Sequence, residues 1–189
     1  MEELKIAFFD LDGTITEEES SWEYLHRRLG TWSKAKENAR LYFSGKISYE
    51  EWCRLDSELW FGRRLDEIMK LLEEIKITKG LRECVERLRE WGVKLVILTS
   101  GINLLAEKIA EEYGFDEVYA NKLIVRNGVI AGYQALVPFD GKKEVILRIH
   151  RERRVPLKDM AVVGDGETEV PVFRLPLGLK IEVASKCRK

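Results

Sequence analysis

Cysteine and histidine are scarce in this chain of 189 residues. The three cysteines, Cys53, Cys84 and Cys187, lie far apart and form no C-x-x-C pair. Their spacing indicates neither a disulfide framework nor a zinc site, so we expect small apolar residues with spare thiols. His26 and His150 are likewise isolated, and we expect each to be a surface residue of a helix rather than a metal ligand or a base.

Long apolar runs and an excess of charge of one sign are also absent. No apolar stretch approaches the roughly 20 residues that a membrane span needs, and no charged-then-apolar leader precedes the first predicted strand. The 32 Lys and Arg against 33 Asp and Glu give a net charge of -1, which would not draw the protein to nucleic acid or an anionic membrane. We therefore expect a cytoplasmic monomer or homodimer whose partners include neither nucleic acid nor membrane.

Hydrophobic residues make up 45% of the chain, which is enough for one α/β domain with a modest insertion. Three short apolar runs end abruptly in polar residues, as buried parallel strands do. These runs are IAFF at 6–9, VKLVIL at 93–98 and MAVV at 160–163. Helical patterns at 81–92 and 104–114 each end in a glycine.

Strands that alternate with helices predict the α/β fold class, with a doubly wound, Rossmann-like parallel sheet as its core. In such sheets, ligands bind beyond the carboxyl ends of the strands. Asp10, Thr99 and Asp165 each come at or just after the end of one apolar run. We therefore expect these three side chains to lie together at one edge of the sheet.

Residues 18–76 interrupt the alternation with a pattern that is helical throughout. The breaks in this pattern fall near Gly30, Gly45 and Gly62. They predict about four short helices after the first strand, which we interpret as a helical cap over the site. We accordingly divide the chain into a core of residues 1–16 and 77–189 and a cap of residues 17–76.

A second interruption is the segment KLIVRNGVIAGYQALV at 122–137, which alternates about Asn127 and Gly128. An Asn-Gly pair between two β-rich runs is a strong hairpin signal. We expect a two-stranded flap or an extension of the sheet at this point.

Asp10 and Asp12 follow the first predicted strand, where the chain turns outward through Gly13. A carboxylate held near a metal can attack phosphorus, and a second carboxylate can protonate the leaving oxygen and then activate water. Mg²⁺ prefers oxygen ligands and would supply the charge neutralisation that phosphoryl transfer needs. The same D-x-D-G-T pattern also fits a turn or a helix N-cap.

In this predicted alternation of strands and helices, Thr99 and Ser100 end the second strand and begin the helix that follows. Their hydroxyls and backbone N–H groups suit a phosphate oxygen, although an N-cap without a ligand fits as well. Lys142 and Lys143 begin the helical run KKEVILRIH. Two surface lysines ordinarily form a solvated pair, but the helix dipole disfavours cations at this position, which adds weight to a phosphate-binding role for one of them.

Asp165, Glu167 and Glu169 place three carboxylates just after the third predicted strand. Such a cluster repels itself unless a cation is present, which favours a hard divalent metal. An acidic first turn of a helix is the alternative. A dinucleotide fingerprint would need glycine where the chain has Glu169, so we exclude nicotinamide binding.

In their order along the chain, these motifs resemble those of the haloacid dehalogenase (HAD) superfamily of phosphohydrolases. The resemblance is to its phosphoserine phosphatase-like branch, which has a helical, C1-type cap after the first motif. DLDGT is similar to the first motif, LTSG to the second, the lysine of GKKE to the third and GDGETE to the fourth. One D-x-D-x-T is weak on its own, but four motifs in order over nearly the whole chain are specific.

The resemblance implies roles for the matching carboxylates. Asp10 would be the nucleophile and a metal ligand, and Asp12 the acid and base, with its backbone carbonyl on Mg²⁺. Asp165 would be a further metal ligand. Asp12 also argues against the dehalogenase members, which typically lack the second aspartate.

The phosphate would be bound by Thr99, Ser100 and a lysine. We prefer Lys142 to Lys143 because Lys142 directly follows Gly141 and fits the family's spacing better.

The predicted cap suggests a substrate contact. In phosphoserine phosphatases, a glutamate after the first motif and an arginine in the cap hold the ammonium and carboxylate of the amino acid. Glu19 and Arg54 fall at similar positions, although both also fit ordinary helix-surface charges. Trp22, Trp52 and Trp60 would form either the core of the cap or a lid over an apolar substrate group.

Two features depart from the family pattern. The chain has Thr168 and Glu169 where the family commonly has Asn and Asp, so Glu169 would act in the second shell of the metal with a longer side chain. The chain also ends with LGLKIEVASKCRK, where relatives of the family continue with another strand and helix. The sheet would then be short at one edge or covered by a partner.

Together these features predict a Mg²⁺-dependent phosphatase of small phosphorylated metabolites, with phosphoserine as one candidate. A phosphomutase of the same superfamily is one alternative. A non-enzymatic phospho-accepting signalling domain is another, although receiver domains carry the accepting aspartate on a middle strand and have no helical cap.

Overall fold

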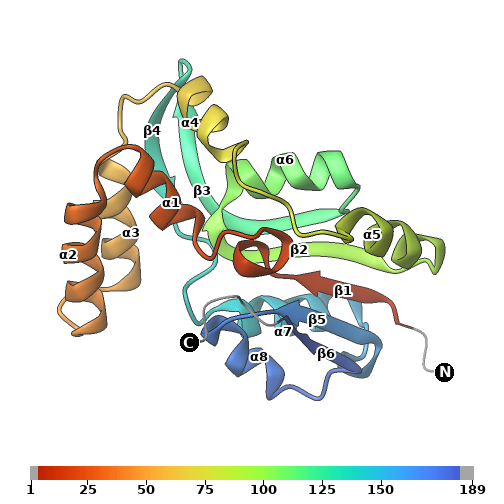
Figure 1. Ribbon diagram of the computed structural model, residues 1–189. Coiled ribbons are helices and arrows are strands. Elements are labelled where there is room, and N and C mark those ends of the chain that lie inside the picture. Colours follow the sequence, from red (N-terminus) through yellow and green to blue (C-terminus); the bar gives the residue numbers. More distant parts are fainter. Residues whose placement is uncertain (1–3, 184–189) are drawn as a thin grey trace.

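The computed structural model describes residues 4–183 and has a central sheet with helices on both faces (Figure 1). The strands are β1 (Ile6–Phe9), β2 (Lys94–Ile102), β3 (Glu117–Arg126), β4 (Val129–Gln134), β5 (Met160–Gly164) and β6 (Leu179–Glu182). Their order is β4-β3-β2-β1-β5-β6, and all the neighbouring pairs except β3 and β4 are parallel. The predicted α/β fold is therefore confirmed.

The helices divide into an inserted group and a group that covers the sheet. The inserted helices are α1 (Ser21–Arg28), α2 (Trp32–Phe43), α3 (Tyr49–Glu58) and α4 (Leu65–Leu72). The others are α5 (Leu81–Glu90), α6 (Asn103–Tyr113), α7 (Lys142–Arg153) and the short α8 (Val170–Phe173). In Figure 1, α5 and α6 lie on one side of the sheet and α7 and α8 on the other.

β1 is buried along its whole length because both faces of the sheet are covered. Ala7 and Phe9 belong to one hydrophobic core, and Ile6 and Phe8 belong to the other. This division follows from the alternation of side chains along a strand. Burying one such large apolar side chain stabilises the fold by about 1.5–3 kcal/mol, so the end of β1, where Asp10 begins, is firmly held.

The four helices predicted after the first strand are confirmed, and they end at the predicted breaks. Gly30, Gly45 and Gly62 all have positive φ, which glycine adopts without strain. Ser20 caps α1 by accepting a hydrogen bond from the Glu23 N–H at 3.2 Å. The two ends of the inserted segment meet at an antiparallel bridge between Thr16 and Ile77.

The predicted hairpin is also confirmed, as strands β3 and β4 at the edge of the sheet. Asn127 and Gly128 have φ of 50° and 76°, as a two-residue hairpin turn requires. The hairpin also binds the inserted segment, because Gly62 N–H donates to the Ile130 carbonyl and Leu65 N–H to the Gly128 carbonyl, both at 2.9 Å.

Two local predictions were wrong. Thr99 and Ser100 do not open a helix, because β2 continues to the buried Ile102, which pairs with Asn121 of β3. His26 is not a surface residue, because its ring packs against Trp60 and its Nδ1 lies 2.8 Å from the Thr31 hydroxyl oxygen.

β6 continues the sheet beyond β5, and its apolar residues Leu179 and Ile181 are exposed. Cys187, at the end of the chain, lies outside the described residues. Within residues 4–183, no helix has both the length and the apolar character that a membrane crossing requires.

Candidate active site

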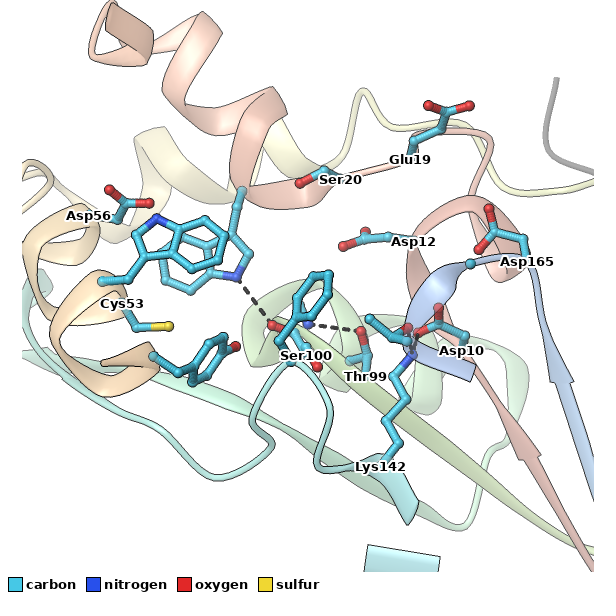
Figure 2. A pocket seen from close by; sticks show the side chains of 17 residues that line it. Asp10, Asp12, Glu19, Ser20, Cys53, Asp56, Thr99, Ser100, Lys142 and Asp165 are labelled. Carbon is cyan, nitrogen blue, oxygen red and sulfur yellow. Dashed lines mark hydrogen bonds and ion pairs between the residues drawn. The ribbon is translucent and has the colours of Figure 1, made fainter. Parts of the chain in front are cut away.

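A cavity of about 450 Å³ lies where the carboxyl ends of β1, β2 and β5 face the inserted helices (Figure 2). We call one part of its lining the core end, formed by Asp10, Asp12, Thr99, Lys142, Asp165 and Thr168. We call the other part the aromatic end, formed by Trp22, Tyr49, Trp52, Cys53, Asp56 and Phe139. Glu19 and Ser100 also line the cavity.

Asp10 is the first residue after β1, and its N–H donates to the Val163 carbonyl of β5 at 2.9 Å. One carboxylate oxygen, Oδ1, accepts a hydrogen bond from Leu11 N–H at 2.8 Å and lies 2.7 Å from Lys142 Nζ. Burial raises the pKa of Asp10 above its ordinary value, and the nearby Lys142 ammonium opposes that rise. Asp10 is therefore a buried carboxylate with a fixed orientation and one paired oxygen.

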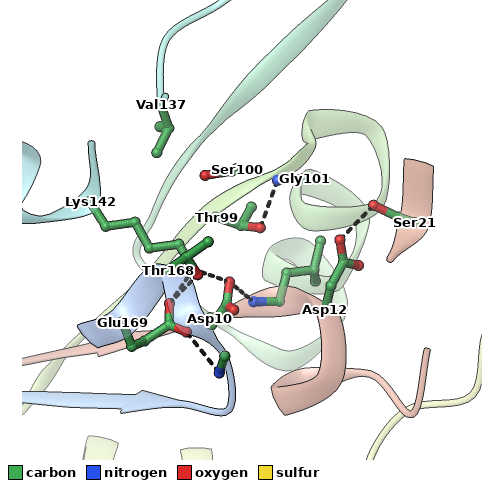
Figure 3. Close-up of polar contacts among 12 residues, drawn as sticks. Asp10, Asp12, Ser21, Thr99, Ser100, Gly101, Val137, Lys142, Thr168 and Glu169 are labelled. Atoms are coloured by element: carbon green, nitrogen blue, oxygen red, sulfur yellow. Dashed lines mark hydrogen bonds and ion pairs between the residues drawn. The ribbon is translucent and has the colours of Figure 1, made fainter. Parts of the chain in front are cut away.

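Lys142 is the first residue of α7 and is 3% exposed. Its ammonium pairs with Asp10 and Glu169 and donates to Thr168 Oγ1 at 3.0 Å (Figure 3). Burial alone would lower the pKa of Lys142, but the two carboxylates raise it above its ordinary value, so the side chain stays charged. Lys143 is half-buried and lies outside the cavity lining.

Asp12 projects from a tight turn after β1 in which Gly13 has a φ of 73°. Its Oδ2 accepts a hydrogen bond from the Ser21 hydroxyl at 2.9 Å, while its Oδ1 is buried without a hydrogen-bond partner. Burial, and then the charge of Asp10, raise the pKa of Asp12 to about 7. This carboxyl group can therefore gain and lose a proton near neutral pH.

Thr99 and Ser100 lie side by side in the last part of β2 but face different partners. The Thr99 hydroxyl is buried and accepts a hydrogen bond from Gly101 N–H at 2.9 Å. The Ser100 hydroxyl donates to the Pro138 carbonyl at 3.0 Å. The predicted phosphate-binding residues Thr99, Ser100 and Lys142 thus all line the cavity, and the Thr99 hydroxyl keeps a proton that it can donate.

Asp10, Asp165 and Glu169 bring carboxylate oxygens within 4.8 Å of one another. Burial, and then the charges of Asp10 and Glu169, raise the pKa of Asp165 to about 6. A Cβ on Gly13 would lie 2.2 Å from Asp165 Oδ2, so glycine is needed there for the close approach. An oxygen-rich group of acids whose charges repel is consistent with a site for a hard divalent cation.

A family model for haloacid dehalogenase-like hydrolases matches residues 7–174. The chain belongs to this family. It is 27% identical to a phosphoserine phosphatase of Methanocaldococcus jannaschii over 96% of this chain and 86% of that protein. It is 30% identical to one of Lactococcus lactis subsp. lactis, over 89% of this chain and 78% of that protein.

Among solved structures, a substrate-bound phosphoserine phosphatase complex is 25% identical to this haloacid dehalogenase-like hydrolase, with a TM-score of 0.77. The match covers 96% of this chain and 87% of the other. The resemblance predicted from the four motifs is therefore confirmed, and with it the class of enzyme.

The aromatic end of the hydrolase cavity is built from α1, α3 and the segment after β4. Trp22 Nε1 donates to the Ser100 carbonyl at 3.3 Å, and its ring stacks on Trp60. The rings of Tyr49 and Trp52 meet edge to face, with centroids 6.1 Å apart. Trp22 and Trp52 thus line the cavity, whereas Trp60 is fully buried behind it.

Glu19 and Arg54 are not brought together by the fold. Glu19 lines the cavity on the exposed segment before α1. Arg54 lies outside the cavity lining, is half exposed, and pairs on its own helix with Glu51 at 2.7 Å and with Glu58.

Sequence reasoning missed three polar residues of the site. Ser21 is fully buried and orients Asp12. Asn121 donates to the carbonyls of Ser100 and Val137, which ties the end of β2 to the segment after β4. Asp56 is a buried carboxylate at the aromatic end. A polar residue within an apolar strand pattern could have indicated Asn121, but Ser21 and Asp56 look like ordinary helix residues.

Proposed function

We propose that the chain is a Mg²⁺-dependent phosphatase that hydrolyses small phosphomonoesters through an aspartyl-phosphate at Asp10. The observation that carries this proposal is the 2.7 Å contact between Lys142 Nζ and Asp10 Oδ1 inside the cavity. It joins a buried carboxylate to a buried cation where a phosphate would bind. The phosphoserine phosphatases among its relatives support the same activity, and residues 17–76 would form the cap.

Asp10 would attack phosphorus through Oδ2, because Oδ1 already binds Leu11 N–H and Lys142. A bond forms from Oδ2 to phosphorus as the ester P–O bond breaks. Lys142 and the Thr99 hydroxyl would bind phosphate oxygens and hold the ester in line for this attack.

Asp12 would move the proton in both steps. Its Oδ1 is buried without a partner, while Ser21 fixes Oδ2. In the first step the protonated carboxyl group gives its proton to the leaving alkoxide. In the second it takes a proton from the water that cleaves the aspartyl-phosphate. A pKa of about 7 suits both transfers at neutral pH.

The side chains of Asp10 and Asp165 and the backbone carbonyl of Asp12 would hold Mg²⁺. When bound, the ion would neutralise charge on the phosphate oxygens. Glu169 lies within the same group of carboxylates and pairs with Lys142. We assign it to positioning that lysine. Its side chain fits because position 164 is glycine, where a Cβ would lie 2.3 Å from Glu169 Cγ.

Replacement of the nucleophile tests this mechanism. Asp10→Asn should lower the Mg²⁺-dependent release of phosphate from p-nitrophenyl phosphate by at least about 10³-fold. Asp66→Asn, an exposed aspartate of α4 paired with Arg64, is the matched control and should keep wild-type turnover. Undiminished turnover in Asp10→Asn would rule out the mechanism.

Two further assays separate the alternatives. Transfer of phosphate between positions of a sugar phosphate in the presence of a bisphosphate would indicate a phosphomutase. A long-lived phosphoprotein without turnover would indicate a phospho-accepting domain.

A further inference from the structure

The aromatic end of the cavity differs from the core end in charge. Among the described residues that line the cavity, Lys142 alone has a cationic side chain, and it is engaged by Asp10 and Glu169. Figure 2 shows Asp56 at the far end of the cavity from Lys142. Arg54, the cap arginine expected to bind the substrate's carboxylate, lies outside the lining.

The Asp56 side chain is only 7% exposed. Its Oδ1 accepts a hydrogen bond from the neutral Asn38 amide at 2.7 Å. Its Oδ2 lies 3.6 Å from His26 Nε2, which is beyond hydrogen-bond distance and forms an ion pair only when the imidazole is protonated. A buried carboxylate in this setting favours a positive charge in the adjoining cavity.

Four aromatic side chains line the same end of the cavity, from three separate segments: Trp22, Tyr49, Trp52 and Phe139. The faces of such rings attract cations, and aromatic cages of this composition suit alkylammonium groups. Phe139 also meets Phe43 of α2 with ring centroids 6.1 Å apart, so the rings reach across from the core to the inserted helices.

We infer that the aromatic end binds an alkylammonium group, so that the substrate is the phosphate monoester of an amino alcohol. This inference rests on the proposed phosphatase function and names its substrate class. Phosphoserine suits this cavity less well, because it adds a carboxylate to a lining whose one cationic side chain among the described residues, Lys142, is already engaged by Asp10 and Glu169. Hydrolysis would release inorganic phosphate and the free amino alcohol, with water supplying the oxygen to phosphorus.

Three small esters test the inference with Mg²⁺ present. They are phosphocholine, phosphoserine, and 3,3-dimethylbutyl phosphate, in which carbon replaces the charged nitrogen of phosphocholine. We expect kcat/KM for phosphocholine to exceed each of the other two by about tenfold or more. Equal or better turnover of phosphoserine or of the neutral ester would overturn the inference and leave the phosphatase function intact. Inactivity toward all three and p-nitrophenyl phosphate would overturn both.

Variants of the aromatic end locate the preference. In Asp56→Asn and in Trp52→Leu, the ratio of kcat/KM for phosphocholine to that for the neutral ester should fall at least about fivefold. A ratio measured within one variant does not depend on the fraction of folded protein. Glu58→Gln removes an exposed carboxylate of the same helix and should keep the wild-type ratio. An unchanged ratio in both cavity variants would overturn the assignment of this end.

Discussion

The two ends of the cavity are held together by different forces. At the core end, the buried ammonium of Lys142 pairs with the buried carboxylates of Asp10 and of the adjoining Glu169. At the aromatic end, rings pack on rings, and the carboxylate of Asp56 is bound by the neutral Asn38. Substitutions at the core end should therefore lower both stability and rate, whereas those at the aromatic end should change which ester is hydrolysed.

Lys142→Met is the most severe test of the core end. It would leave Asp10 and Glu169 buried without a cation, and breaking a buried ion pair in this way costs about 3–5 kcal/mol of unfolding free energy. Loss of the phosphate-binding cation should also lower kcat by about 10²–10³-fold. Urea unfolding and phosphate release measure the two effects.

Lys143→Met is the matched control, because Lys143 is next in sequence but outside the cavity lining. It should keep the stability and turnover of the wild type. If Lys142→Met were as stable as the control, the stability of the core end would not depend on these ion pairs.

Ser21→Ala tests how Asp12 is oriented. Burial and the charge of Asp10 raise the pKa of Asp12, and hydrogen bonds from the backbone and the hydroxyl of Ser21 oppose that rise. Without the Ser21 hydroxyl, the pKa of Asp12 should be higher still and kcat lower by about tenfold. Asp12 must be protonated to protonate the alkoxide, so activity falls as pH rises through its pKa, and the variant's fall should come at higher pH.

Profiles of kcat against pH for the wild type, Ser21→Ala and the exposed control Ser44→Ala check this prediction. The control should follow the wild type. If kcat of Ser21→Ala fell over the same alkaline pH range as kcat of the wild type, the role of Asp12 as the acid would be contradicted.

Without bound metal, the stability of the fold should depend on pH through the carboxyl groups of the core end. The folded chain holds protons on Asp12 and Asp165 with pKa values of about 7 and about 6, against an ordinary value of 3.8. The folded state therefore binds more protons than the unfolded one, and stability in EDTA should fall as pH rises from about 4 to about 7.

Mg²⁺ should offset this loss, by about 2.7 kcal/mol at 100 times its Kd. Thermal unfolding in EDTA and in Mg²⁺ measures the difference, and Asp165→Asn should abolish the response to Mg²⁺. Stability in EDTA that rises over the same pH range would be contrary to the expected linkage.

The carboxylates and Thr99 of the core end could be predicted from the sequence because they lie at or just after the ends of apolar runs, whereas Lys142 was found from the resemblance to the family. Asp10, Thr99 and Asp165 come together once the runs form a parallel sheet. The end of β2 was misjudged because its pairing with β3 is tertiary and leaves no local mark at Thr99.

The aromatic end could not be predicted in the same way, since it depends on which face of α3 packs inward. Arg54 and Asp56 are two residues apart, which places them about 200° apart around a helix. Only one of the two can face the cavity. The composition of α3 does not decide between them, because both faces carry charged residues.

Arg54→Ala is expected to have the smallest effect and bears directly on this point. Arg54 is paired with Glu51 and Glu58 on the exposed face of α3, and exposed ion pairs contribute little to stability. kcat/KM for phosphoserine and for phosphocholine should both stay within about twofold of the wild type, as in the control Arg64→Ala. If Arg54 instead bound the substrate's carboxylate, as its position in the sequence suggested, kcat/KM for phosphoserine alone should fall by about tenfold or more. Such a loss would mean that α3 turns its other face to the substrate, and the aromatic end as described would not be the leaving-group site.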